Sequence, residues 1–225
     1  MSSAAPHLSS AAFDWFKEIE ANNNRDWYLA NKKRFDTQIE APFVALLDAV
    51  TLRLQDADLP LIGSKKTMFR MNRDVRFSND KSPYKTSVSA LLTPSGTKSE
   101  ADGLMYLQIG REGAFLAAGI HNATPAQLAP VRDAIIADAD GFSEMLAQLK
   151  SSGLSLWAKN SLTSMPRGYA EHSDHPHAPV IRLKTVVVQK DLSPDACMSA
   201  DLPEVVATFG KGAAPLLAFL RGALA

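Results

Sequence analysis

The sequence predicts a single α+β domain in which helices at both ends of the chain flank a mostly antiparallel sheet. In the first sixty residues, apolar positions follow the spacing of helices. From Lys66 to residue 120 the period changes to alternation, which is typical of strands with short connections. Helical spacing returns after Thr124. Residues 1–10 are small and polar, so we expect a flexible N-terminus followed by one domain over residues 11–225.

Three helices are expected before residue 60. Ser9 or Ser10 can cap the first helix, and Asn24 can cap the second after the NNN run has ended the first. Pro42 suits the first turn of the third helix, where its missing N–H is not needed. The first helix carries Phe13, Phe16 and Ile19, the second Trp27, Tyr28 and Phe35, and the third an apolar stripe of Phe43, Leu46, Leu47, Val50 and Leu54. A core position is favoured for Trp15, and the role of Trp27 is left open.

Residues 66–120 are expected to form contiguous antiparallel strands. Alternation from Phe69 to Phe77 predicts an extended segment over residues 68–77. Pro94, Gly96 and Gly113 separate the runs that follow. The further predicted strands are 86–92, 104–110, 114–120 and, later in the chain, the β-branched run 180–190.

The remaining segments predict helices. Thr124 followed by proline, with Gln127 three residues after the threonine, has the pattern of a capping box. The helix that it opens would bury Leu128, Val131, Ile135 and Ile136. A second helix is expected over about residues 141–150, and a third over residues 202–224 with a break at 210–212, where two glycines occur.

The stretch 65–85 concentrates positive charge. It contains seven Lys or Arg and two Asp, a net charge of +5, so the rest of the neutral chain carries −5. A cluster of cations in a concave site focuses positive potential. Arginine also matches carboxylate or phosphate in two-point contacts.

Strand parity divides these cations between two faces. In an extended segment Arg70 and Arg76 share one face, while Arg73 falls among the apolar residues of the other. A buried guanidinium needs a partner, so Arg73 should contact a carboxylate or point into a polar cavity. The turn chemistry of residues 78–83 would then bring Lys81, Tyr84 and Lys85 toward the strand end.

The segment RDVRFSNDKSPYK at 73–85 resembles the signature of the family called domain of unknown function 2461. Three further segments are similar to that family. They are ANNNRDWYLANKKRFD at 21–36, GAFLAAGIHNATPAQLAPVRDAI at 113–135 and SMPRGYAEHSDHPHAPVIRLKT at 164–185. The resemblance covers nearly the whole chain. It implies no particular activity, substrate or cofactor.

Three hypotheses follow for the basic stretch. In the first, it binds an anionic small molecule that bears a phosphate or carboxylate. The candidate ligand-binding residues are Arg70, Arg73, Arg76, Lys81, Tyr84 and Lys85. In the second, the same pocket is the active site of an enzyme acting on a phosphorylated or nucleotide-like substrate, with Asp74 or Asp80 as base. In the third, the arginines and aspartates pair with each other and only fix the turn.

Other polar residues give weaker indications. His172, Asp174, His175 and His177 are possible metal ligands, but they are crowded on one loop with prolines, so a locally hydrogen-bonded loop is favoured. Cys197 lacks the context of a nucleophile and is expected to be a buried thiol. We therefore predict no metal site and no cofactor.

Arg25 and Trp27 follow the NNN run and have two possible roles. They either belong to the capping of the second helix or line a cleft with the basic strand.

Composition limits the partners. A net charge of zero does not favour a general nucleic-acid binder, and no apolar run is long enough for a membrane span. One cysteine excludes an internal disulfide, and a cytoplasmic location is expected. The oligomeric state is left open.

Overall fold

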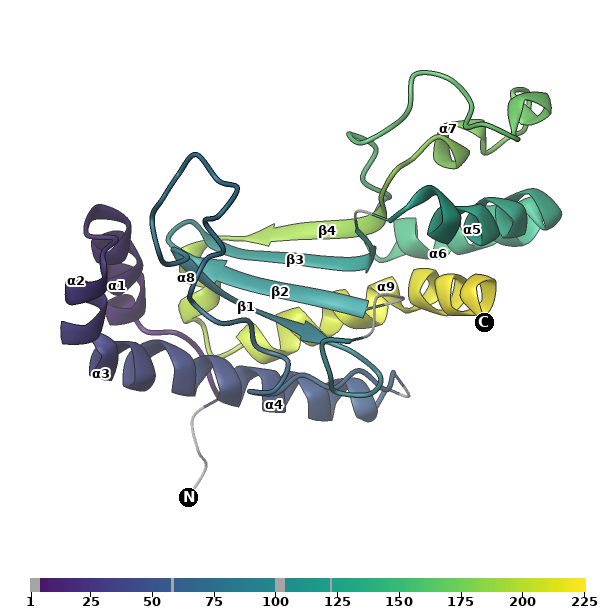
Figure 1. The fold of residues 1–225 in the computed structure, drawn as a ribbon. Coiled ribbons are helices and arrows are strands. Elements are labelled where there is room, and N and C mark those ends of the chain that lie inside the picture. Colours follow the sequence, from purple (N-terminus) through teal and green to yellow (C-terminus); the bar gives the residue numbers. More distant parts are fainter. Residues whose placement is uncertain (1–4, 58, 100–103, 122) are drawn as a thin grey trace.

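In the computed structural model, the described residues are 5–57, 59–99, 104–121 and 123–225. They form one α+β domain around a four-stranded antiparallel sheet in the order β1-β2-β3-β4 (Figure 1). The strands are β1 (Ser87–Leu92), β2 (Leu104–Gly110), β3 (Gly113–Ile120) and β4 (Val186–Leu192). The longer helices are α1 (Ser10–Ala21), α4 (Ala41–Gln55), α5 (Pro125–Ala137), α6 (Ala139–Ser151) and α9 (Leu202–Leu224). The shorter helical segments are α2 (Arg25–Ala30), α3 (Lys32–Phe35), η1 (Asp36–Glu40), η2 (Ala170–His172), α7 (Ala178–Ile181) and α8 (Pro194–Met198).

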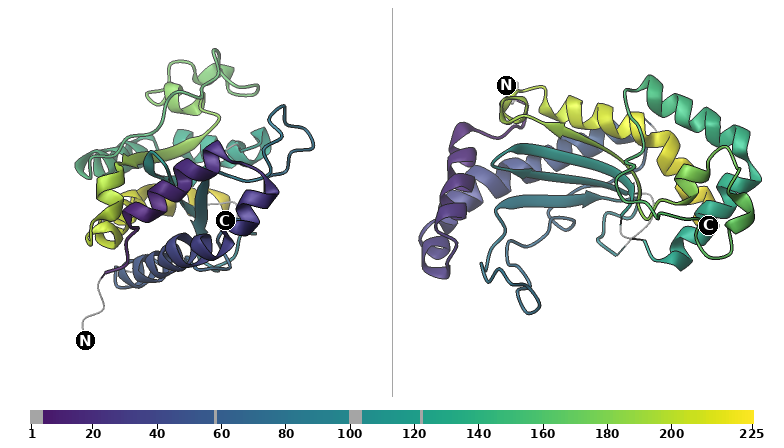
Figure 2. Two further views of the ribbon diagram at one scale, coloured as in Figure 1. Left: turned by 90° about the vertical axis from the view of Figure 1, so that its left-hand side faces the viewer. Right: turned by 90° about the horizontal axis from the view of Figure 1, so that it is seen from above.

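Helices cover one face of the sheet. α4 and α9 run side by side beneath the strands, with α1 to α3 at one end of the sheet and α5 and α6 at the other (Figures 1 and 2). This covered face carries every second residue of the strands, because successive side chains point to opposite faces. Its buried side chains are Val88, Ala90, Leu92, Met105, Leu107, Ile109, Ala114, Leu116, Ala118, Ile120, Val186, Val188 and Leu192.

The opposite face, here called the open face, carries the other parity. Cross-strand pairing aligns Ser89, Gln108, Phe115 and Asp191 in one row. The next row consists of Leu91, Tyr106, Ala117 and Gln189. Among the described residues no helix lies over these rows, and two irregular segments border the face instead. Residues 67–69 run beside β1, and residues 156–157 run beside β4.

Helices form over the N-terminal segment as predicted, but their bounds differ, since α2 ends at Ala30 and Phe35 lies in α3. Ser9 holds the cap position of α1 without a side-chain cap hydrogen bond. Asn24 caps α2, since its side chain accepts a hydrogen bond from the Trp27 N–H at 3.0 Å. Pro42 does not open a separate helix. The chain remains helical from Lys32 through Gln55, and the five residues before Ala41 form a wider π turn. Such a turn accommodates a residue without an N–H inside a longer helical run.

The prediction of strands throughout 66–120 is wrong for residues 66–86. Pairing there is limited to isolated bridges, Met68 with Ala90 and Asn72 with Tyr84, and the chain turns at residues 76–77. Aspartate side chains explain the break. Asp74 accepts from the Arg76 N–H at 3.2 Å, and Asp80 accepts from the Ser82 N–H at 2.9 Å. Such local bonds compete with a ladder.

The predicted strand over 180–190 begins only at Val186. Residues 178–181 form α7, and Arg132 engages the backbone that follows. The Arg132 guanidinium donates to the Ile181 carbonyl at 2.8 Å and to the Leu183 carbonyl at 3.3 Å. Both carbonyls therefore accept hydrogen bonds from the Arg132 side chain and not from a neighbouring strand.

The C-terminal helices confirm the capping box and correct the predicted break. Thr124 accepts from the Gln127 N–H at 3.3 Å, and the Gln127 side chain accepts from the Thr124 N–H at 3.0 Å. α9 continues through residues 210–212. Gly210 serves close packing, because a Cβ there would lie 2.9 Å from a methyl carbon of Leu54. Among the described residues, no helix combines the length and the apolar character needed to span a bilayer.

Part of the N-terminal segment contacts the domain. Of the predicted flexible N-terminus, residues 1–4 lie outside the described residues. Leu8 is fully buried, and its N–H donates to the Cys197 carbonyl at 3.1 Å. The N-terminal segment is therefore attached to the domain from Leu8 onward.

Candidate functional site

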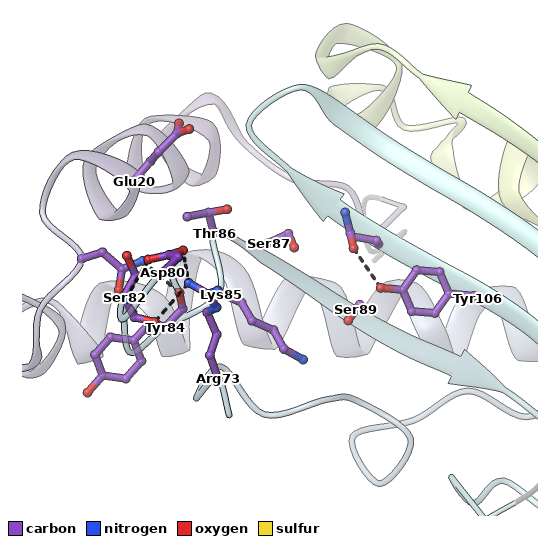
Figure 3. A pocket seen from close by; sticks show the side chains of 12 residues that line it. Glu20, Arg73, Asp80, Ser82, Tyr84, Lys85, Thr86, Ser87, Ser89 and Tyr106 are labelled. Carbon is purple, nitrogen blue, oxygen red and sulfur yellow. Dashed lines mark hydrogen bonds and ion pairs between the residues drawn. The ribbon is translucent and has the colours of Figure 1, made fainter. Parts of the chain in front are cut away.

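A polar cavity opens on the sheet where the basic stretch joins β1. Its volume is about 500 Å³. Its lining comes from the end of α1, from the stretch 73–86, and from β1 and β2 (Figure 3). The lining residues are Glu20, Asn23, Arg73, Asp80, Ser82, Tyr84, Lys85, Thr86, Ser87, Ser89, Tyr106 and Gln108. Hydroxyl and amide groups dominate this set, which makes the cavity suited to a polar ligand.

Asn23 fixes one wall of the cavity through two hydrogen bonds to the backbone of Tyr84. Its side-chain amide donates to the Tyr84 carbonyl at 2.9 Å and accepts from the Tyr84 N–H at 3.0 Å. The Tyr84 ring stacks on Tyr28, with ring centroids 4.0 Å apart. Two segments that are 61 residues apart in sequence are thereby joined next to Lys85.

Arg25 and Trp27 do not line this cavity. Trp27 packs on Trp15, with ring centroids 5.6 Å apart, and Arg25 is exposed. The helix-capping interpretation of their segment therefore holds for Asn24, while Asn23 has a tertiary role that was not predicted. Its neighbourhood in sequence gives no sign of this contact.

Arg73 has the carboxylate partner that strand parity required. It forms an ion pair with Asp80 and also donates to the Ser82 carbonyl at 3.2 Å, and its side chain is 26% exposed. Hydrogen bonds from Ser82 and from Arg73 lower the pKa of Asp80 to about 2. Both groups line the cavity, so Arg73 is present there as one half of a neutral pair.

Arg76 and Lys81 lie outside the cavity, at the tip of the loop. Arg76 pairs with Asp74 at 2.7 Å, and Lys81 donates to the Val75 carbonyl at 3.0 Å. The loop stands away from the sheet (Figure 1), and Phe77 at its turn is 95% exposed. The expectation that Arg70 and Arg76 share a face is not met, because Arg76 lies at the turn of the loop whereas Arg70 lines another cavity.

Lys85 is the cation that the cavity leaves without a charged partner. It is half-buried, and its ammonium lies 5.0 Å from the centre of the Phe69 ring. Lys98 lies 5.9 Å from the same ring and donates to the Met68 carbonyl at 2.9 Å. Burial, Arg70 and Lys98 together lower the pKa of Lys85. Among the described residues, no carboxylate forms an ion pair with Lys85, Lys98 or Arg70.

Arg70 faces a second cavity, next to the first. That cavity has a volume of about 300 Å³. It is lined by Phe69, Arg70 and Lys98 together with residues of α2, α3 and η1. Arg70, Lys85 and Lys98 thus form a cationic cluster around Phe69, with Lys85 on the side of the polar cavity.

The two cavity residues on β2, Tyr106 and Gln108, were not singled out from the sequence. Tyr106 donates to the Gln108 side chain at 2.8 Å, and burial raises the pKa of Tyr106. The signal that points to them is the alternation in LMYLQIG, where Tyr106 and Gln108 occupy the less apolar parity. On a strand covered on one side only, that parity faces outward.

The histidine loop is held by local hydrogen bonds. His177 contacts the Ser143 hydroxyl at 2.9 Å and the Ala139 carbonyl at 3.0 Å, and His175 accepts from the His177 N–H at 3.1 Å. Burial, together with His177 and His172, lowers the pKa of His175. Within the described part of the chain, no three His, Cys, Asp or Glu side chains are grouped so that they could hold a metal ion.

Cys197 and the two loop aspartates bear on the enzyme hypothesis. Burial raises the pKa of Cys197 to about 11, which keeps the thiol protonated and a weak nucleophile. Asp74 and Asp80 both have lowered pKa values, caused by hydrogen bonds from Arg76 and from Ser82 respectively. A general base works best when its pKa lies near the working pH, so these shifts do not favour either carboxylate as a base.

Fold and site together define a single-domain α+β protein with a polar, partly cationic cavity on the open face of its sheet. The chain belongs to the family described as "Conserved hypothetical protein (DUF2461)", whose model matches residues 11–219. Comparison with curated proteins and with solved structures gives no match.

Proposed function

We propose that the protein binds a small molecule bearing a phosphate or carboxylate, with its anionic group held at Lys85 in the polar cavity. The observation that carries the proposal is the cationic cluster of Arg70, Lys85 and Lys98, which has no ion-pair partner among the described residues. Lys85 is half-buried, whereas Arg70 and Lys98 are exposed. Burial and the repulsion by these two neighbours both add to the free-energy cost of the charged form of Lys85. An anion removes that cost.

The rest of the cavity supports the same ligand chemistry. Ser87 and Ser89 follow Lys85 on the same parity of β1, and Tyr106 and Gln108 lie on the neighbouring strand. These side chains and the Lys85 ammonium can donate to phosphate or carboxylate oxygens. Arg73 adds a further donor when an incoming anion competes with Asp80 for it. We retain the expected cytoplasmic location, on the basis of the single buried thiol.

The test is a thermal-shift titration with phosphate, pyrophosphate and citrate against chloride at matched ionic strength. Wild type should be stabilised by at least one of these anions, because binding to the folded state alone raises its stability. Lys85→Met keeps the length of the side chain and removes its charge, so it should abolish the shift. The effect should weaken with added salt.

Lys66→Met is the matched control. Lys66 is an exposed lysine of the same basic stretch, and it does not line the polar cavity. It should respond like wild type. Stabilisation that is equal in Lys85→Met and in wild type would show that the anion binds elsewhere. No stabilisation of wild type by any of these anions would leave the basic stretch as a structural motif.

A further inference from the structure

An apolar cavity, distinct from the polar cavity and from the cavity that Arg70 faces, lies on the same open face. Its volume is about 530 Å³. The rings of Tyr106, Phe115 and Trp157 contribute to its lining, with the aliphatic side chains of Leu91 and Val187. Trp157 is held beside β4 because its backbone N–H donates to the Val187 carbonyl at 2.8 Å. Aromatic rings on a one-sided sheet form a platform for another flat ring.

The apolar and the polar cavity share one lining residue. Tyr106 lines both of them. Its ring centroid lies 6.4 Å from that of Phe69 and 6.3 Å from that of Phe115. The rings therefore follow one another across the sheet, and Lys85 and Lys98 lie over the Phe69 end.

We propose that the open face binds one amphiphilic ligand, an aromatic phosphate or carboxylate, whose anionic group lies at Lys85 and whose ring lies between Phe115 and Trp157. This inference rests on the proposed function and adds the class of the ligand. Charge complementarity fixes the orientation, because the cations lie at the β1 edge, whereas the apolar cavity extends from Leu91 on β1 across the sheet to Trp157 beside β4.

The size of the ligand follows from the sheet. The spacing from β1 to β3 is two inter-strand distances, about 10 Å. A single phosphate or carboxylate ion fills only the Lys85 end of such a span. An aryl phosphate with one or two fused rings reaches Phe115. A flat ring is favoured over a flexible chain, because it stacks on aromatic side chains and has less conformational freedom to lose.

The experiment compares inorganic phosphate, phenyl phosphate, 1-naphthyl phosphate and an alkyl phosphate with as many carbons as the naphthyl compound. Affinities are measured by calorimetry, and contact with the apolar cavity is followed by tryptophan fluorescence. Trp157 lines that cavity, whereas Trp15 is buried beneath the N-terminal helices and Trp27 packs on it. We expect 1-naphthyl phosphate to bind at least about tenfold more tightly than phosphate, as expected when several ring carbons leave water.

Two variants separate this inference from the proposed function. Phe115→Ala should reduce the affinity for 1-naphthyl phosphate to that for phosphate, while leaving phosphate binding intact. Lys85→Met should weaken the binding of every anion. Trp157→Phe should remove the change in fluorescence and retain binding.

Three outcomes would overturn the inference. Phosphate binding that depends on Lys85 without any gain from the ring would refute the amphiphilic ligand and leave the proposed function standing. An equal gain from the alkyl compound would refute the aromatic class. No binding of any anion by wild type would remove both proposals together.

Discussion

The two faces of the sheet are built from alternate residues of the same four strands, yet they differ in what completes them. On the covered face, Leu107 and Leu116 are fully buried against helices of the same chain. On the open face, Tyr106, Gln108 and Phe115 remain partly exposed and line cavities. The covered face obtains its partners from within the chain. The open face presents cations, hydroxyls and rings for which the described residues supply only part of the contacts.

This difference separates stability from binding. Truncation of a covered side chain should lower the free energy of unfolding, since it leaves a cavity in the core. Truncation of an open-face side chain should change stability little and binding strongly.

The largest difference in the free energy of unfolding is expected between variants of two adjacent β2 residues that point to opposite faces of the sheet. Leu107→Ala should lower the free energy of unfolding by about 2 to 5 kcal/mol, the usual range for a buried leucine. Gln108→Ala removes one partly exposed hydrogen bond and should cost at most about 1 kcal/mol. Urea denaturation measures both. Similar losses for the two variants would contradict the division between the faces.

The next largest effect on stability is expected from the titration of the buried Cys197 thiol. Cys197 is fully buried, and its pKa is raised from 9.0 to about 11 because burial disfavours the thiolate. Its folded pKa exceeds its unfolded pKa, so its contribution to stability is complete below pH 9 and is lost as the pH rises toward 11. The loss is on the order of 2 kcal/mol.

The measurement is the free energy of unfolding at several pH values in that window. Cys197→Ala should show a flatter dependence on pH than wild type. Tyr28 remains in both proteins, and burial raises its pKa to about 12, so part of the alkaline slope will persist. Equal slopes for the two proteins would show that the thiol titrates normally.

A smaller loss is expected at the rim of the open face. Asn23→Ala removes both hydrogen bonds to the backbone of Tyr84 and should cost about 1 to 2 kcal/mol. Anion binding at Lys85 should weaken too, because Tyr84 precedes it in the chain. Asn22→Ala is the matched control, since Asn22 donates only to the Glu18 carbonyl on an exposed helix end. If Asn22→Ala has the same effect, the hydrogen bonds from Asn23 to Tyr84 do not position the anion site at Lys85.

The sequence correctly predicted strands in which apolar residues alternate clearly with more polar ones. In β2, Met105, Leu107 and Ile109 alternate with more polar residues, and the strand lies where expected. The capping box at Thr124 was predicted for a similar reason, because its hydrogen bonds are local. Turn chemistry placed Tyr84 and Lys85 near the end of the strand predicted over residues 68–77, and in the structure both line the polar cavity.

Interactions between distant segments could not be predicted in this way. The contact of Asn23 with Tyr84 and that of Arg132 with the carbonyls after α7 depend on the finished fold. Arg73, Arg76 and the two loop aspartates fit an extended pattern equally well. Only competition between side-chain and backbone hydrogen bonds decides that residues 73–82 form a loop.

The smallest effect on stability is expected at Tyr106, the residue that joins the two cavities. Tyr106→Phe keeps the ring between Phe69 and Phe115 and removes the hydroxyl that donates to Gln108 at 2.8 Å. The loss should be below about 1 kcal/mol. A double-mutant cycle with Gln108→Ala isolates the hydrogen bond, and we expect a coupling of about 0.5 to 1 kcal/mol. A coupling of zero would mean that the amide is not held by the hydroxyl, so the open face would not be organised before a ligand arrives.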